Sequence, residues 1–231
     1  MLSALRARQP GQPLLRVLWW YFLHLLCVFT VGLRYQYRAT GAHHIPRTGA
    51  VLFVCNHQSF LDPILVGLSG HRRQFYAMAR ATLFRNPFFA FLIRSLNAIP
   101  VRQGVGDTSA MRTCIKVLKG GHALLVFPEG ERTIDGCTHT FAPGTMLLIK
   151  RTRAQVVPVA IEGAYNAWPR FRRRPQLRGR IHVRFGKALD AGLLVDMGSA
   201  EALKHLENDI ETMRRQMAGN LKQMKPGVGF V

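Results

Sequence analysis

Acidic residues are scarce in this sequence of 231 residues. Aspartate and glutamate number 12 against 32 lysines and arginines, which leaves a formal net charge of +20 with histidine neutral. An excess of this size indicates anionic partners: nucleic acid, an anionic lipid surface or phosphorylated small substrates. Charged residues make up only 19% of the chain and apolar residues 48%, a balance that excludes an intrinsically disordered chain and favours one sizeable core.

Cysteine is also scarce, and its spacing argues against two kinds of site. There are four cysteines, and no C-x-x-C pair is present to indicate zinc or redox chemistry. Their wide separation also argues against an extracellular disulfide framework. We therefore expect reduced, mostly buried thiols at Cys27, Cys55, Cys114 and Cys137.

One long apolar run stands near the N-terminus. Residues 17–33 (VLWWYFLHLLCVFTVGL) contain one strongly polar side chain, His24. This length is at the short limit for crossing a bilayer core of roughly 30 Å. Arginines precede the run, as in a signal peptide, but Arg34 and Arg38 follow it instead of a small-residue cleavage site. An uncleaved membrane anchor is therefore favoured over a signal peptide and a buried soluble helix, and basic residues on both flanks suit a spanning helix or an in-plane helix or hairpin equally.

Beyond residue 40, short apolar runs alternate with amphipathic windows. This pattern predicts an α/β fold, a mainly parallel two-sided sheet flanked by helices. Strands are expected at residues 50–55, 75–78, 98–101, 123–127 and 156–161, and helices at 62–68, 87–96, 107–119, 144–153 and from 199 onward. Alternating polarity at 181–185 predicts an edge strand with one wet face. The expected division is an anchoring segment, 1–40, and an α/β domain, 41–231.

The motif NHQSFLD follows the expected strand 50–55. Ligands of α/β sheets gather at the carboxyl ends of strands, so the motif lies where a catalytic pair belongs. His57 can act as a general base near neutral pH, and Asp62, close along a tight turn, can fix its tautomer and stabilise the imidazolium. The alternative is that Asp62 only caps the next helix, with Pro63 at its first position, while His57 binds backbone.

The motif FPEGER follows the expected strand 123–127. It brings Glu129 and Arg132 to the same sheet edge, and Gly130 lets a ligand approach the backbone. Arg132 offers a planar fork suited to phosphate, and Arg102, after strand 98–101, is a second candidate clamp. Each feature alone fits a surface turn or a solvated arginine. Joined to the base and carboxylate above, they suit acyl transfer to the hydroxyl of a phosphate-bearing acceptor.

Four motifs, NHQSFLD, IPVR, FPEGER and VPVAIEG, occur in this order over about residues 41–185. The set resembles the lysophosphatidic acid acyltransferase family of glycerolipid enzymes. The resemblance implies that His57 deprotonates the free hydroxyl of a lysophospholipid for direct attack on an acyl thioester, with Asp62 orienting the ring. The first candidate acceptor is 1-acylglycerol 3-phosphate, which yields phosphatidate. The residues implied to hold the glycerol phosphate are Arg102, Glu129, Gly130 and Arg132.

The resemblance also implies the partners and the location. The donor is acyl-CoA or acyl carrier protein, with no metal and no cofactor. The site is expected at the cytoplasmic membrane, facing the cytoplasm. Two other hypotheses stay open: the same chemistry on another lysolipid, including an acylated amino-acid lipid, and a non-catalytic basic protein that binds membranes or nucleic acid.

The chain departs from the family pattern at three positions. Arg80 stands where many members have a lysine followed by an acidic residue, Glu131 stands where threonine is common, and Pro143 replaces a frequent lysine. These departures bear on the identity of the acceptor more than on the type of reaction.

A basic run lies near the C-terminal end of the motifs. Residues 170–187 contain eight cations and no acid. An anionic membrane is favoured over nucleic acid as its partner, because each cation near such a surface contributes about 1 kcal/mol and the chain already has an apolar anchor. We therefore expect no nucleic-acid partner.

Overall fold

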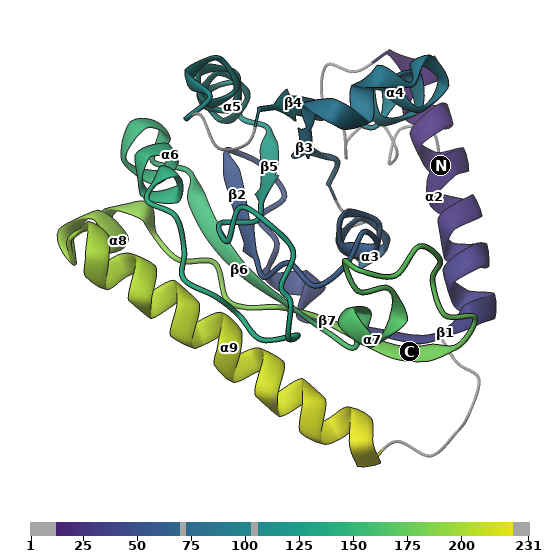
Figure 1. Ribbon diagram of the computed structural model, residues 1–231. Helices are drawn as coiled ribbons and strands as arrows, with labels where there is room; N and C mark the ends of the chain where they lie inside the picture. Colours follow the sequence, from purple (N-terminus) through teal and green to yellow (C-terminus); the bar gives the residue numbers. More distant parts are fainter. Residues whose placement is uncertain (1–12, 70–72, 103–105, 224–231) are drawn as a thin grey trace.

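The computed structural model describes residues 13–69, 73–102 and 106–223, in which a seven-stranded sheet carries helices on both faces (Figure 1). The strands are β1 (Tyr35–Thr40), β2 (Val51–Cys55), β3 (Phe75–Arg80), β4 (Ala98–Val101), β5 (Ala123–Val126), β6 (Gln155–Glu162) and β7 (Gly179–Phe185). The helices are α2 (Leu14–Arg34), α3 (Asp62–Ser69), α4 (Pro87–Ser95), α5 (Thr108–Lys119), α6 (Gly144–Thr152), α7 (Ala164–Ala167), α8 (Ala191–Asp196) and α9 (Ser199–Gln223), with 3-10 turns η1 (Ala42–His44) and η2 (Ala81–Arg85).

The sheet order is β1-β7-β6-β2-β5-β3-β4. All neighbours pair in parallel except β6 and β7, which are antiparallel. Every residue of β2 is buried, as expected of an apolar strand covered on both faces. The predicted mainly parallel α/β fold is confirmed. The carboxyl ends of β2 to β6 therefore meet along one edge of the sheet.

Two apolar cores lie on the two faces of this sheet. One core packs side chains of β2 such as Phe53 against α2, α3 and α7. The other packs Leu52 and Val54 against α5, α6, α8 and α9, where the apolar stripe of α9 docks as its spacing predicts. Figure 1 shows the first group of helices to the right of the sheet and the long helix α9 along its lower left.

Residues 181–185 are not an edge strand, and the prediction there was wrong. β7 lies between β1 and β6, and β1, which begins directly after α2, is the edge strand on this side of the sheet, with β4 at the other side. The polar positions of β7 misled the pattern because each finds a partner on another element of the fold. His182 is buried with Nε2 3.0 Å from Thr40 Oγ1, and burial lowers its pKa to about 4, so the ring is neutral. Arg184 reaches Gln216 of α9.

Helix α2 covers the expected apolar run. It is long and apolar enough to cross a membrane, a test that signal sequences and soluble core helices also pass, and only 17% of its apolar window is buried. Val17, Leu23 and Val31 are its buried side chains. Arg6 and Arg8, which precede the run in the sequence, lie outside the described residues. Of the four free cysteines, Cys55 and Cys114 are buried, Cys27 is half-buried and Cys137 is exposed.

Gly163, between β6 and α7, has a φ of +87° and passes close to β7. A Cβ there would lie 2.0 Å from the carbonyl oxygen of Arg180. Gly198, with a φ of +86°, is the matched control, because a Cβ there meets nothing within 4 Å in the described structure. We expect Gly198→Ala to cost only the ~1–2 kcal/mol of left-handed strain and Gly163→Ala to cost clearly more, by denaturant unfolding. Equal losses would refute the steric role of β7.

Candidate active site

The loop after β2 begins with Asn56, whose side chain continues the pairing of β2 with β6. Its Nδ2 donates to the carbonyl of Ile161 at 3.0 Å, and its Oδ1 accepts the N–H of Ile161 at 2.8 Å. The amide is fully buried, so both of its hydrogen-bonding atoms are used where water is absent. This pairing fixes the point at which His57 leaves the sheet.

His57 and Asp62 form a hydrogen-bonded pair at this edge. Nδ1 of His57 lies 2.8 Å from Oδ2 of Asp62. The same oxygen accepts the backbone N–H groups of Gln58 at 2.6 Å and Ser59 at 2.7 Å. The bonds of Asp62 therefore tie the loop before α3, whereas an N-cap, the alternative role of Asp62, would hold amides inside that helix. Asp62 is fully buried.

The ring of His57 is fixed on a second side. It stacks on Phe127 with 4.0 Å between the ring centroids and an angle of 17° between the planes. Its side chain is 19% exposed. A carboxylate only accepts hydrogen bonds, so the proton of the pair lies on Nδ1 and Nε2 carries the lone pair. The arrangement is that of a general base with an oriented ring.

Glu129 ties the loops after β2 and β5 together. Its Oε1 accepts the backbone N–H of His57 at 2.8 Å, and its Oε2 accepts that of His139 at 3.3 Å. Burial raises the pKa of Glu129 to about 8, although the two N–H groups favour the ionised form. Gly130, next in the turn, has a φ of +76°, and a Cβ there meets nothing within 4 Å of the described residues. The backbone conformation is therefore what calls for glycine here.

Arg132 lies against an aromatic surface beside the pair. Its guanidinium carbon is 3.3 Å from the ring centroid of Phe60. Its Nη1 is buried without a hydrogen-bond partner in the described part of the chain. Burial, then the charges of Arg80 and Arg170, lower the pKa of Arg132, and Asp62 acts in the opposite direction. Three arginines thus concentrate positive charge next to the His57–Asp62 pair, as an anion site requires.

Glu131, one of the departures from the family pattern, forms an ion pair with Arg170. Its Oε2 lies 3.0 Å from Nη1 of Arg170, which also donates to the carbonyl of Arg132 at 3.2 Å. The negative charge of Glu131 is therefore opposed by a neighbouring cation. Sequence reasoning missed this contact: an extra acid needs a counter-charge, but nothing in the sequence selects one of the eight cations in the basic run.

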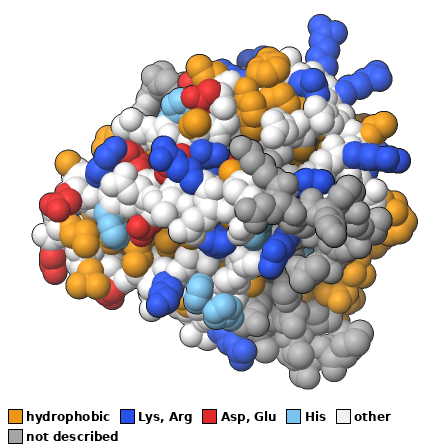
Figure 2. Space-filling view, turned by 90° about the horizontal axis from the view of Figure 1, so that it is seen from below, with side chains coloured by type: hydrophobic (Ala, Val, Ile, Leu, Met, Phe, Trp, Pro, Cys, Tyr) orange, Lys and Arg blue, Asp and Glu red, His pale blue; other side chains and the backbone are white. Residues whose placement is uncertain are grey.

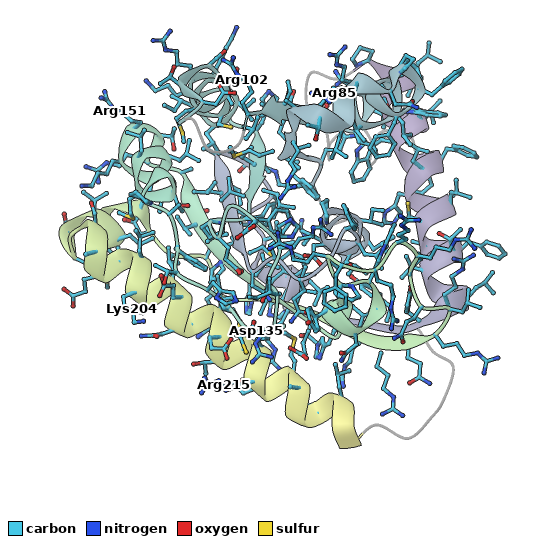
Figure 3. The ribbon with its side chains drawn as sticks, viewed as in Figure 1. Arg85, Arg102, Asp135, Arg151, Lys204 and Arg215 are labelled. Atoms are coloured by element: carbon cyan, nitrogen blue, oxygen red, sulfur yellow. The ribbon has the colours of Figure 1, made fainter. Side chains whose placement is uncertain are left out.

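Arg102 is the predicted site residue that the structure leaves apart. Its side chain is 73% exposed, and its Nε lies 3.6 Å from Oδ2 of Asp107. It lines an open hollow of ≈ 500 Å³ with Arg16 and Arg94. Figure 3 shows Arg102 beside α5, well away from Asp135 in the loop that carries Arg132. Among the described residues no group of three or more His, Cys, Asp or Glu could hold a metal ion.

Helix α9 makes polar contacts with the loop after β5 and with the end of β6. Glu207 accepts the backbone N–H of Phe141 at 2.7 Å. Arg214 reaches Glu162 at the end of β6 at 2.7 Å and is also bonded to Glu211. The sequence predicts the apolar stripe of this helix but not its contacts with Phe141 and Glu162, because these partners are distant in the chain.

Residues 36–162, more than half of the chain, match the family described as Acyltransferase. The chain belongs to the acyltransferase family. It is 23% identical to the 1-acyl-sn-glycerol-3-phosphate acyltransferase of Bacillus subtilis (strain 168), over 84% of this chain and 94% of that protein. It is 30% identical to a lyso-ornithine lipid O-acyltransferase of Pseudomonas aeruginosa, over 68% of this chain and 59% of that protein. The predicted resemblance to the lysophosphatidic acid acyltransferases is confirmed.

A solved structure shares the fold of this acyltransferase. The crystal structure of the 1-acyl-sn-glycerophosphate (LPA) acyltransferase PlsC from Thermotoga maritima matches with a TM-score of 0.73 at 23% identity. The match covers 97% of this chain and 89% of that one. The N-terminal apolar helix is therefore part of an architecture that the two chains share.

The half-buried Glu129 makes the stability of this acyltransferase depend on pH. Its pKa is about 8 in the folded chain against the ordinary 4.5, so between these values the folded state binds a proton that the unfolded state has lost. The contribution of Glu129 to the free energy of unfolding therefore falls as the pH rises through this window. We expect Glu129→Gln to gain stability relative to wild type between about pH 5 and about pH 8, by denaturant unfolding.

The control is Glu201→Gln, which removes the same charge from an exposed position on α9. A wild-type-to-Glu129→Gln difference that follows the control across this range would contradict the raised pKa of Glu129.

Proposed function

We propose that this acyltransferase moves an acyl chain from acyl-CoA or acyl carrier protein to the free hydroxyl of 1-acylglycerol 3-phosphate, giving phosphatidate. The observation that carries the proposal is the 2.8 Å contact of His57 Nδ1 with Asp62 Oδ2 at the end of β2, beside Arg132. The name of the Bacillus subtilis relative, a 1-acyl-sn-glycerol-3-phosphate acyltransferase, supports the choice of acceptor.

His57 is the general base of the proposed reaction. Its Nε2 takes the hydroxyl proton of the acceptor as the hydroxyl oxygen attacks the thioester carbonyl carbon. Asp62 keeps the ring oriented and stabilises the imidazolium. The proton then passes to the leaving sulfur as the carbon–sulfur bond breaks, which gives an ester and a free thiol. This order of bond formation and cleavage requires no acyl-enzyme intermediate, no metal and no cofactor.

The arginines of the site hold the acceptor phosphate in this proposal. Arg132 has a buried, unpartnered N–H group within the described structure, and Arg80 and Arg170 add charge around it. Glu129 and Gly130 shape the turn that presents Arg132. Arg102 acts from the far end of the same sheet edge, where with Arg16 and Arg94 it attracts anionic substrates.

A lyso-ornithine lipid is the second candidate acceptor. The Pseudomonas aeruginosa relative that carries this name is 30% identical to the chain, against 23% for the Bacillus subtilis relative. The chain also departs from the family pattern at Arg80 and Glu131, both of which lie around the anion site. The chemistry at His57 is the same for either acceptor.

We propose that α2 lies in the plane of one leaflet, with the active site facing the cytoplasm, where acyl thioesters are available. The helix is held along the domain by Trp19 Nε1 to Ser95 Oγ at 2.8 Å and Arg16 to Asn97 at 2.6 Å. Its outer face exposes Leu15, Phe29 and Leu33. A helix bonded to its own domain in this way favours an in-plane position over a spanning one.

Charge supports an anionic membrane as the partner. Figure 2 shows Lys and Arg side chains spread over one face of the molecule, while acidic side chains lie mainly toward its left half. The net charge of +20 comes with an apolar helix, a pair of features that suits anionic lipid better than nucleic acid.

Replacing the base tests the mechanism. We expect His57→Ala to lower kcat about 10²- to 10⁴-fold, because proton transfer in the transition state is lost. The measurement is transfer of a labelled acyl chain, from acyl-CoA and from acyl carrier protein, to lysophosphatidate and to lyso-ornithine lipid. His205→Ala, at a side chain of α9 that is 41% exposed, is the control and should keep wild-type kcat. Retained activity in a folded His57→Ala variant would end the mechanism, while the preferred acceptor decides between the two lipids.

Replacing Arg132 tests the phosphate site. We expect Arg132→Gln to lower kcat/KM for lysophosphatidate about 10- to 100-fold through a higher KM, because a charge-assisted contact with phosphate is lost. Arg151→Gln removes the same charge from α6, whose Arg151 projects from the left side of Figure 3. If both variants lose activity equally, net charge rather than Arg132 governs binding of the acceptor.

A further inference from the structure

Helix α4 exposes aromatic side chains that the apolar cores do not use. Phe88 is 87% exposed, Phe91 70% and Phe89 43%, on a helix of nine residues. The same segment ends in the exposed side chain of Arg94 and is preceded by Arg85 at the end of η2. A clustered aromatic surface of this kind marks an interaction site.

This surface is continuous with the exposed face of α2. The hydrogen bonds of Trp19 to Ser95 and of Arg16 to Asn97 fix the start of α2 against the end of α4. Figure 3 shows ring-bearing side chains projecting from α4 and from α2 toward the same right-hand side, away from the sheet. A flat partner that contacts one helix therefore also reaches the other.

The charges around α4 have one sign. No acidic residue occurs between Asp62 and Asp107, a stretch that includes all of η2 and α4. The cations of this stretch include Arg85, labelled beside α4 in Figure 3, and Arg94, whose guanidinium lies 5.4 Å from the ring centroid of Phe84. Aromatic rings with basic residues at their border are typical of protein surfaces that lie in the interface of an anionic bilayer.

We propose that α4 is a second membrane-contact element, which inserts Phe88 and Phe91 among the acyl chains of an anionic bilayer while Arg85 and Arg94 lie at the headgroups. The inference rests on the proposed membrane association of α2. A second copy of the chain is a poorer occupant, because joining two α4 surfaces would bring the arginines of both copies together without an acid between them.

The position of α4 connects the bilayer to the anion site. η2 joins α4 to the end of β3, where the charge of Arg80 acts on Arg132. An open, mostly apolar hollow of ≈ 580 Å³ lies along this connection, lined by Thr82, Leu83, Asn86, Phe88, Phe89 and Leu92. A lysolipid can therefore bring its headgroup toward the arginines while its acyl chain stays in apolar surroundings.

The test is flotation of the full chain with vesicles of phosphatidylcholine and phosphatidylglycerol. We expect the double variant Phe88→Ser, Phe91→Ser to partition at least about tenfold more weakly than wild type. Leu193→Ser is the matched control, because Leu193 is 63% exposed on α8, at the opposite side of the molecule, and should partition like wild type. Circular dichroism verifies that each variant is folded.

A second measurement tests the proposal even if the double variant fails to fold. Phe91→Trp should add fluorescence that brominated lipids quench, whereas Leu193→Trp should add fluorescence that they do not. If wild type does not float, the membrane association of the proposed function fails with this inference. If wild type and the folded double variant float equally, or if the fluorescence added by Phe91→Trp is not quenched, only the role of α4 is overturned. A dimer that the double variant abolishes would also overturn it, by assigning the surface to a second copy.

Discussion

Oδ2 of Asp62 accepts three hydrogen bonds in a fully buried position, from the ring of His57 and from two backbone amides of the loop before α3. A buried carboxylate is costly without hydrogen bonds, and Oδ1 of Asp62 has no partner in the described structure, so the compensation rests on the three bonds that the closed loop supplies to Oδ2. That closure presents His57 to the sheet edge, and Glu129 then bonds the backbone of His57 from the neighbouring loop. The positions of His57, the turn after β5 and Arg132 all follow from this enclosed carboxylate.

The chain uses many of its few acids for internal structure. Glu207 and Glu211 of α9 accept backbone N–H groups of the loop after β5, and Glu211 is also paired with Arg214. Asp107 and Asp190 accept the first amides of α5 and α8. Because these carboxylates are engaged, the surplus of arginine stays at the surface and around the anion site. The positive charge is therefore concentrated at the surface and around the anion site. The buried core itself is apolar.

The sequence was a good guide where burial is continuous along a strand. Strands β2 and β5 are apolar at every position and covered on both faces, so they were predicted closely, and the motifs that follow them came to one sheet edge as expected. It was a poor guide where polar residues find distant partners. His182 and Arg184 look solvated in sequence, yet His182 is buried against β1 and Arg184 is hydrogen-bonded to α9. The pairing of Glu131 with Arg170 joins residues from separate loops, and no periodicity encodes such a contact.

The junction of α2 and β1 also matters for how the enzyme would search for its substrates. The helix ends at Arg34 and the strand begins at Tyr35, and β1 is hydrogen-bonded to β7 along its whole length, so the helix enters the sheet without a linker. A bilayer that takes up α2 therefore fixes the tilt and height of the entire domain. In the proposed membrane-bound state, rotational freedom would be given up once, at docking, and lipids would then reach the sheet edge by lateral diffusion in two dimensions.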